Sequence, residues 1–112
     1  MSPLKITTRD ATTGPVLGII GELDYDTAPA LRDVLATVTL RPGQRLVIDL
    51  TAMEFCDSSG LTALIVARNH ALATQADIAL AGVPEHTLRL MHLTGLAQIF
   101  PLHPDSEAAT RP

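Results

Sequence analysis

The sequence predicts one α/β domain with a mixed, mostly parallel sheet of about four to five strands and helices packed on it, in the order ββαβαβαβ. From Val16 onward, apolar runs of strand length alternate with stretches of helical period, and Gly or Pro separates them. A chain of 112 residues has room for a single domain. We expect that domain to span residues 1–112, with its core over 4–103 and a polar tail over 104–112.

The first two strands are expected to form a hairpin. Leu4, Ile6 and Thr8 alternate with polar residues, which is typical of a half-exposed strand. Turn-forming residues follow over 10–15, and residues 16–20 are a short apolar run that Gly21 should end. The first strand should therefore run antiparallel at or near an edge of the sheet.

The first helix is predicted after a polar loop. Asp26 or Thr27 can cap it, and Pro29 falls in its first turn, where proline's missing N–H costs nothing. Its apolar positions recur with helical spacing: Leu31, Val34, Leu35 and Val38. Residues 41–43 should stop it.

The central unit is a strand over 46–50, a loop over 51–57 and a helix over 58–74. Large residues mark one face of this helix, and small apolar residues mark the other, so most of it should be buried. The large residues are Leu61, Leu64, Ile65, Arg68 and Leu72; the others are Ala63, Val66, Ala67 and Ala71.

The last units are a strand over 78–81, a helix over 85–94 and a short strand over 100–103. Leu88, Leu90, Met91 and Leu93 should face inward, with Gly95 just after the helix C-terminus. Pro101 places the final strand at an edge of the sheet. We expect one helical turn in the tail and otherwise loose chain.

Composition excludes several functions. The net charge is −4, basic residues are scattered and aromatics make up 3%, so we expect no direct nucleic-acid or membrane contact. The single cysteine, Cys56, suits a reducing compartment. The N-terminus lacks the pattern of a signal peptide, and no apolar run is long enough to cross a membrane. We therefore expect a cytoplasmic protein.

Two polar loops follow predicted strands, over 21–27 and 51–60, and would share one rim of the sheet if those strands are neighbours. The second places Ser58 at or beside a helix N-cap. Ser58 either caps the helix or, because a helix N-terminus favours an anion, carries a phosphate. Asp24 and Asp26 are either turn and cap residues or carboxylates beside Ser58.

Enzyme chemistry is not indicated. No G-x-S-x-G elbow surrounds Ser58, and no motif places a histidine base beside it. A phospho-receiver built on Asp49 or Asp57 would need a lysine on a late strand, whereas the only lysine is Lys5. The histidines do not have metal-ligand spacing, and no phosphate loop is present, so we expect no metal and no cofactor. Cys56 is either a buried packing residue or a thiol activated by the helix N-terminus.

Three separated motifs resemble those of the STAS domain family over about residues 4–103. They are Gly21-Glu22-Leu23-Asp24 before a helix beginning Ala28-Pro29-Ala30-Leu31; Leu46-Val47-Ile48-Asp49-Leu50-Thr51 before Phe55-Cys56-Asp57-Ser58-Ser59-Gly60-Leu61; and Leu93-Thr94-Gly95-Leu96 before Ile99-Phe100. Many such proteins read DSSGLG, whereas Thr62 replaces the last glycine here. This difference does not affect the match to the fold. It changes the contact surface and therefore bears on which partner protein is recognised.

The resemblance implies an anti-sigma factor antagonist, which is a non-enzymatic partner-switching phosphoprotein that regulates transcription. Its partner would be an anti-sigma factor, which is a serine kinase with a histidine-kinase-like ATPase fold. This kinase would phosphorylate Ser58, and the phosphorylated protein would then dissociate from it. A serine phosphatase would reset the protein, which we expect to be a monomer or weak dimer. The resemblance implies partner binding by Asp24, Asp26, Asp57, Ser58, Ser59, Gly60 and Thr62.

The family leaves an alternative, a STAS module of a transport system or of a stress-signalling scaffold. Transport modules frequently lack the phosphoacceptor serine, and scaffolds usually carry a second domain. The intact run Asp57-Ser58-Ser59-Gly60 therefore favours the antagonist.

Overall fold

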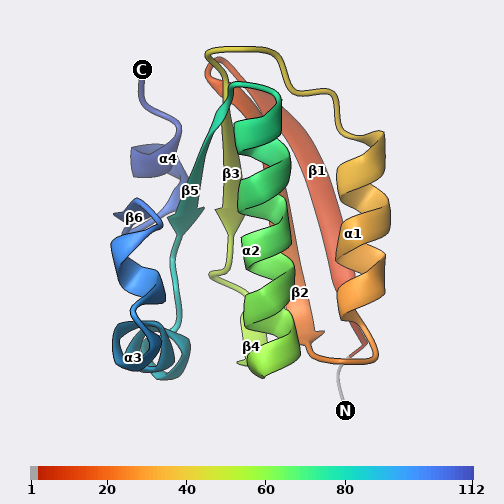
Figure 1. Cartoon of the computed structure of the whole chain (residues 1–112), viewed down its shortest axis with the longest axis vertical. Coiled ribbons are helices and arrows are strands. Elements are labelled where there is room, and N and C mark those ends of the chain that lie inside the picture. The colour runs from red at the N-terminus through yellow and green to blue at the C-terminus, as the bar shows by residue number, and fades with distance from the viewer. Residues whose placement is uncertain (1–2) are drawn as a thin grey trace.

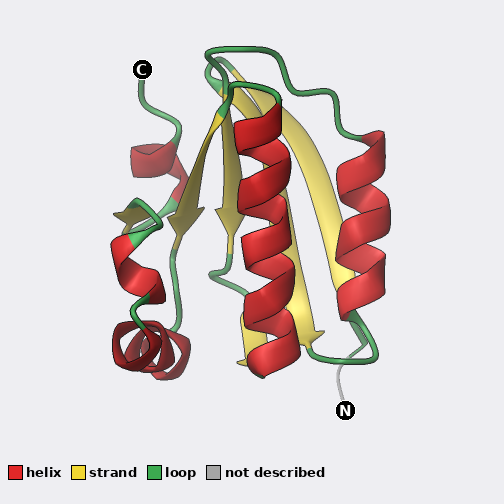
Figure 2. Cartoon of the chain, viewed as in Figure 1, coloured by secondary structure: helices red, strands yellow, loops and turns green. Residues whose placement is uncertain are grey.

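A sheet of six strands carries helices on both of its faces (Figures 1 and 2). The computed structural model describes residues 3–112; Met1 and Ser2, which the predicted domain includes, lie outside the described residues. The elements in chain order are β1 Lys5–Ala11, β2 Gly14–Leu23, α1 Ala28–Thr37, β3 Arg45–Asp49, β4 Met53–Cys56, α2 Ser58–Ala73, β5 Asp77–Ala81, α3 Glu85–Thr94, the 3₁₀ turn η1 Leu96–Gln98, β6 Leu102–His103 and α4 Ser106–Ala109.

The strands lie in the order β1-β2-β3-β5-β6, with β4 beside the far end of β2. β1 and β2 form the predicted antiparallel hairpin, in which Ile6 pairs with Ile19. All other pairs are parallel. The predicted mixed, mostly parallel α/β sheet is thus confirmed, with β1 at one edge and the short strand after Pro101 at the other.

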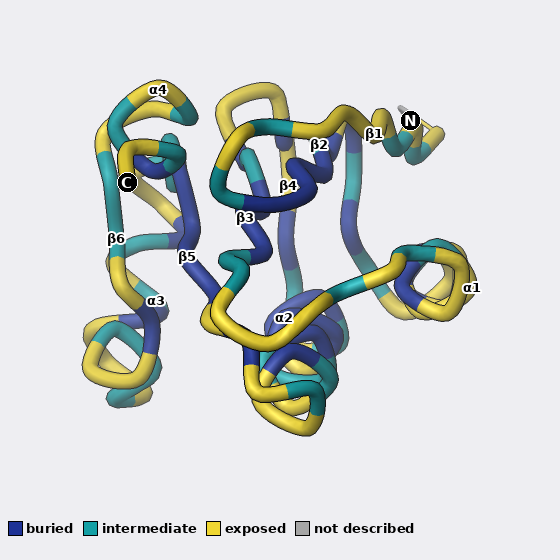
Figure 3. The backbone as a smooth tube through the Cα atoms, turned by 90° about the horizontal axis from the view of Figure 1, so that it is seen from above, coloured by how far each residue is buried: buried dark blue, intermediate teal, exposed yellow. Residues whose placement is uncertain are grey.

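The two faces of the sheet are covered unequally (Figure 3). α1, α2 and α3 lie on one face, where the main core includes the fully buried Leu17, Ile48 and Leu64. On the opposite face, α4 covers a smaller cluster that includes Val47 and Ala109. This division follows from the side-chain alternation of strands, which sends successive residues of β2 and β3 to opposite faces.

β4 was not predicted, because residues 51–57 read as loop. β2 is also longer than predicted, since it continues through Gly21, Glu22 and Leu23. These two differences have one cause: β4 pairs with that extension of β2 and gives its backbone a partner. A strand of four residues with only its ends buried has no periodicity that a sequence can reveal.

Two leucines are more exposed than expected: Leu93, which was predicted to face inward, and Leu72, which belongs to a helix predicted to be mostly buried. Leu72 near the end of α2 is 46% exposed, and Leu93 of α3 is 77% exposed. In α3, Met91 is buried as predicted, together with Thr87 one turn before it. Gly95 does end α3 as predicted, in the left-handed conformation with φ 79°.

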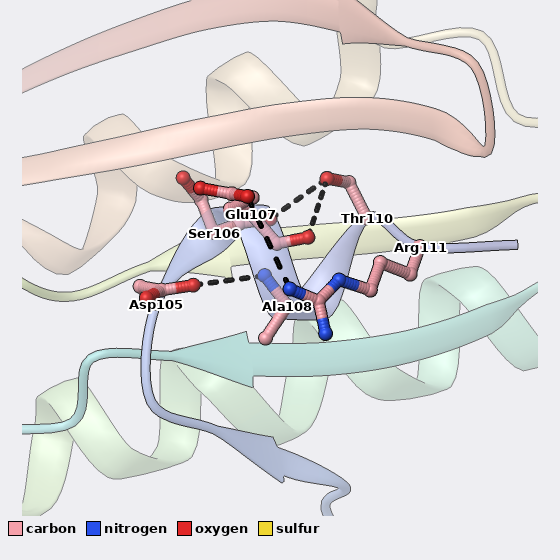
Figure 4. A network of polar contacts seen from close by, with 6 residues as sticks. All are labelled: Asp105, Ser106, Glu107, Ala108, Thr110 and Arg111. Carbon is pink, nitrogen blue, oxygen red and sulfur yellow. Dashed lines mark hydrogen bonds and ion pairs between the residues drawn. The ribbon is translucent and has the colours of Figure 1, made fainter.

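The tail forms the expected helical turn but is packed rather than loose (Figure 4). The Asp105 carboxylate accepts from the Ala108 N–H (2.8 Å) and caps α4, whose Ala109 is fully buried. One guanidinium nitrogen of Arg45 donates to the carbonyls of Ala109 (2.8 Å) and Arg111 (2.7 Å). The sequence does not reveal this anchor, because it joins residues far apart in the chain.

Candidate functional site

The two polar loops meet at one rim of the sheet, as predicted. β3 pairs with residues 16–18 of β2 and β4 with residues 21–23, so the loop after β2 and the turn from β4 into α2 emerge side by side. A groove of about 400 Å³ separates the two, with Tyr25 and Asp26 on one wall and Ser59 and Thr62 on the other. Of the predicted site residues, Asp26, Ser59 and Thr62 line this groove; the others, Asp24, Asp57, Ser58 and Gly60, lie on the same two segments but not on its wall.

Asp57 is the N-cap of α2. Its backbone is extended, and its carboxylate oxygen Oδ1 accepts from the Gly60 N–H at 2.9 Å. Its own N–H donates to the carbonyl of Leu23 (3.3 Å), which ties the start of α2 to the end of β2. The capping function that was one interpretation of Ser58 therefore belongs to Asp57.

Ser58 occupies the first position of α2 and is exposed. Among residues 3–112, its hydroxyl makes no hydrogen bond, and the backbone N–H groups of Ser58 and Ser59 have no acceptor. These free N–H groups and the positive end of the helix dipole favour an anion at this point. Ser59 is half-buried, so Ser58 presents the more accessible hydroxyl.

Gly60 is buried and sets how closely α2 approaches β2. A Cβ atom at this position would lie 2.4 Å from the Leu23 carbonyl oxygen and 2.7 Å from the Cys56 sulfur. Only glycine allows this contact without moving backbone. Gly60 therefore acts on the rim through the placement of Ser58 and Asp57, since its own surface is covered.

Cys56 is a packing residue. It is 1% exposed, and burial together with the neighbouring Asp57 carboxylate raises the pKa of its thiol to about 12. The helix N-terminus does not activate it, because desolvation opposes the thiolate. Of the two interpretations of Cys56, the structure supports the buried packing residue.

Asp24 organises the loop after β2. Its Oδ1 accepts from the N–H groups of Asp26 (3.0 Å) and Thr27 (3.1 Å), and from the Thr27 hydroxyl (3.2 Å). Thr27 is the N-cap of α1, but its hydroxyl donates to the Glu22 carbonyl (2.8 Å) instead of capping the helix. Asp24 thus shapes the loop that carries Asp26, whose side chain is exposed.

Tyr25, Pro29 and Arg32 also line the groove, although the sequence did not indicate them as site residues. Tyr25 is 77% exposed, and an exposed aromatic ring between two candidate aspartates was a usable signal. Arg32 is the only cation on the groove, and among the described residues it forms no ion pair. The surrounding carboxylates of Asp24, Asp26 and Asp57 make this rim predominantly acidic.

Thr62 follows Ser58 by one helical turn, on the same exposed face of α2. Its hydroxyl donates to the Ser58 carbonyl at 2.9 Å.

Asp49, considered above as a phosphate acceptor, instead binds the N–H (3.0 Å) and hydroxyl (2.6 Å) of Thr51.

Within the described part of the chain, no three His, Cys, Asp or Glu side chains gather as a metal ion would need. None of its helices is long and apolar enough to span a bilayer. Fold and rim together define an α/β domain that presents a free serine hydroxyl at the N-terminus of a buried helix, within an acidic surface.

The STAS domain model matches residues 4–109, and the chain belongs to that family. It is 33% identical to the anti-sigma-B factor antagonist of Listeria monocytogenes over 81 residues, which are 72% of this chain and 71% of the relative. It is 33% identical to the anti-sigma-F factor antagonist RsfB of Mycobacterium tuberculosis over 99 residues, covering 88% and 80% of the two chains.

A solved anti-sigma factor antagonist from Mycobacterium paratuberculosis has the same fold. It is 34% identical to this chain, with a TM-score of 0.82, and the superposition covers 97% of this chain and 95% of the other.

Proposed function

We propose that this protein is a non-enzymatic anti-sigma factor antagonist, switched off by phosphorylation of Ser58. The observation that carries the proposal is the exposed Ser58 hydroxyl, which no described residue binds, at the start of a helix capped by its neighbour Asp57. Relatives at 33% identity are anti-sigma factor antagonists, which favours this role over a transport or scaffold module.

In the proposed cycle, the unphosphorylated rim binds an anti-sigma factor, and a sigma factor is released. The anti-sigma factor is a serine kinase with a histidine-kinase-like ATPase fold, and a serine phosphatase restores the free hydroxyl. The cycle takes place in the cytoplasm, and the protein acts as a monomer or weak dimer. It contacts neither nucleic acid nor membrane directly.

Each site residue has a part in this proposal. Ser58 accepts the phosphate, while Asp26, Ser59 and Thr62 line the groove and contact the partner. Asp57 and Gly60 hold Ser58 in place through the cap and the close approach of α2 to β2. Asp24 holds the loop that carries Asp26, and its unshared carboxylate oxygen adds to the acidic surface.

A pull-down from lysate of the source cells tests this function, with the Ser58→Ala variant as bait because it cannot be released by phosphorylation. We expect mass spectrometry to identify a kinase-type anti-sigma factor in the eluate. A transporter subunit in its place would contradict the proposal.

The captured kinase then tests the phosphorylation site with ATP and phosphopeptide mapping. The wild type and Ser59→Ala should be phosphorylated, and Ser58→Ala should not. Ser59→Ala is the matched control, since it removes a hydroxyl one position away. Phosphate retained in Ser58→Ala but lost in Ser59→Ala would overturn the assignment.

A further inference from the structure

The outer edge of β5 is only half covered. β6 pairs with β5 at Leu80 and Ala81 and no further. The Asp77 N–H donates to the Gln44 carbonyl on the β3 side (2.8 Å), whereas the Leu80 N–H donates to Pro101 on the β6 side (2.9 Å). Because peptide groups alternate along a strand, those of Ile78 point to the outer edge, where no described strand pairs with them, although Ile78 itself is buried at 4% exposure.

A groove of about 430 Å³ lies beside this edge. Arg68 of α2 and Arg45 of β3 both line it, together with His103 at the end of β6. Asp77 is the only carboxylate on its wall. The groove therefore has a net positive charge on a chain whose net charge is −4.

Both guanidinium groups are held in place with N–H groups to spare. Arg45 uses one nitrogen, Nη1, for the carbonyls of Ala109 and Arg111. Arg68 uses Nε for the carbonyl of Ile99 (3.3 Å). Neither forms an ion pair among the described residues. Ordered guanidiniums with free donors are well suited to bind carboxylates.

Apolar side chains complete the groove. Leu72 is 46% exposed and Ile99 is 38% exposed, and both lie on its wall. A free phosphate ion would use the guanidiniums alone. An extended peptide would use the guanidiniums and the apolar wall together, because its side chains alternate in direction.

We propose that this groove binds an extended, acidic segment of a partner protein beside the outer edge of β5. This site goes beyond the function proposed above and is separate from the Ser58 rim. Ser58 and Leu72 stand fourteen positions apart on α2, a distance of about 21 Å along the helix axis.

The test is a titration of the ¹⁵N-labelled full chain, followed by amide chemical shifts. The probe is a capped seven-residue peptide of alternating glutamate and valine. We expect saturable shifts at Asp77, Ile78 and Leu72 with a Kd of roughly 0.1–1 mM, and unchanged amides at Ser58. A lysine–valine peptide should bind at least about tenfold more weakly. Inorganic phosphate should not shift the Ile78 amide.

Several outcomes would overturn the proposal. These are no saturable shift with the glutamate peptide, equal binding of the lysine peptide, or the same shifts with phosphate alone. The last result would mean a simple anion site. Shifts confined to the Ser58 rim would mean that the acidic peptide binds elsewhere.

Variants separate charge from structure. Arg68→Gln should weaken the glutamate peptide about tenfold, while Arg68→Lys should retain most of its binding, because the charge remains although the contact to Ile99 is lost. Arg89→Gln is the matched control; Arg89 is exposed on α3 and pairs only with Glu85. If Arg89→Gln weakens binding as much as Arg68→Gln, only net charge acts and the groove is not the site.

Discussion

The Asp57 carboxylate and the Gly60 N–H are joined at 2.9 Å, across the first turn of α2. This bond satisfies one of the helix's free N–H groups and leaves Ser58, between the two residues, unengaged. The residue that precedes the candidate phosphoacceptor is therefore a structural cap, and its removal should affect stability.

Asp57→Ala should lower the free energy of unfolding by about 0.5–2 kcal/mol, because the cap is lost. Asp57→Ser is the matched control, since its hydroxyl can accept the same hydrogen bond, and it should retain most of the stability. Urea denaturation followed by circular dichroism measures both. If the alanine variant is as stable as the wild type, Asp57 is not an effective cap.

Gly60→Ala should be more damaging than its small size suggests. The added methyl would lie 2.4 Å from a backbone oxygen of β2, which cannot turn aside, so α2 would have to shift. We expect a loss of about 1–3 kcal/mol, as for an overpacked core, together with altered amide shifts around Ser58. Unchanged stability and shifts would show that α2 does not need this close approach.

Much of the fold could be predicted from the sequence, because Leu46–Leu50 and residues 58–74 have clear strand and helix patterns. β4 could not, because it depends on pairing with the end of β2, which no local pattern records. At the site, the order of motifs pointed to Ser58 and Asp24. The capping role of Asp57 depended on backbone geometry, and Arg32 reaches the groove only through the packing of α1 beside α2.

Asp24 has two separable roles. Asp24→Ala removes an oxygen that three donors share, so we expect a loss of about 1–2 kcal/mol and not the neutral effect of an ordinary surface change. Asp24→Asn retains an oxygen in that position and removes the charge. It should fold with near wild-type stability and bind the anti-sigma factor more weakly. Calorimetric titration checks the affinity, and wild-type binding by Asp24→Asn would leave Asp24 with the loop role alone.

Cys56 should be inert in the folded protein. Its pKa is raised from 9.0 to about 12, so the folded state holds the proton more tightly than the unfolded state. The contribution of this protonated thiol to the free energy of unfolding is complete below pH 9 and is lost as the pH rises toward 12. A thiol reagent at pH 8 should label the chain only after a denaturant is added. Rapid labelling without denaturant would contradict the buried position.

Phosphorylation of Ser58 should change binding without changing the fold. A phosphate adds about −1.5 to −2 charge at pH 7. Its attraction to the N-terminus of α2 is only about 0.3–2 kcal/mol, which the free protein can accommodate without rearrangement. The buried Leu61 and Leu64 hold the helix behind it. We therefore expect identical circular dichroism spectra and closely similar thermal melts for the two forms.

The complex with the anti-sigma factor should be more sensitive to the added phosphate charge than the free protein is. At about 6 Å from a partner carboxylate, with an effective dielectric constant of about 20, each pair of unit charges repels by about 3 kcal/mol. That energy is roughly a hundredfold in affinity, and loss of the free hydroxyl and crowding of the interface act in the same direction. Titration of both forms against the anti-sigma factor measures the difference. Equal affinities, or a phosphorylated form that has lost secondary structure, would require another mechanism for the switch.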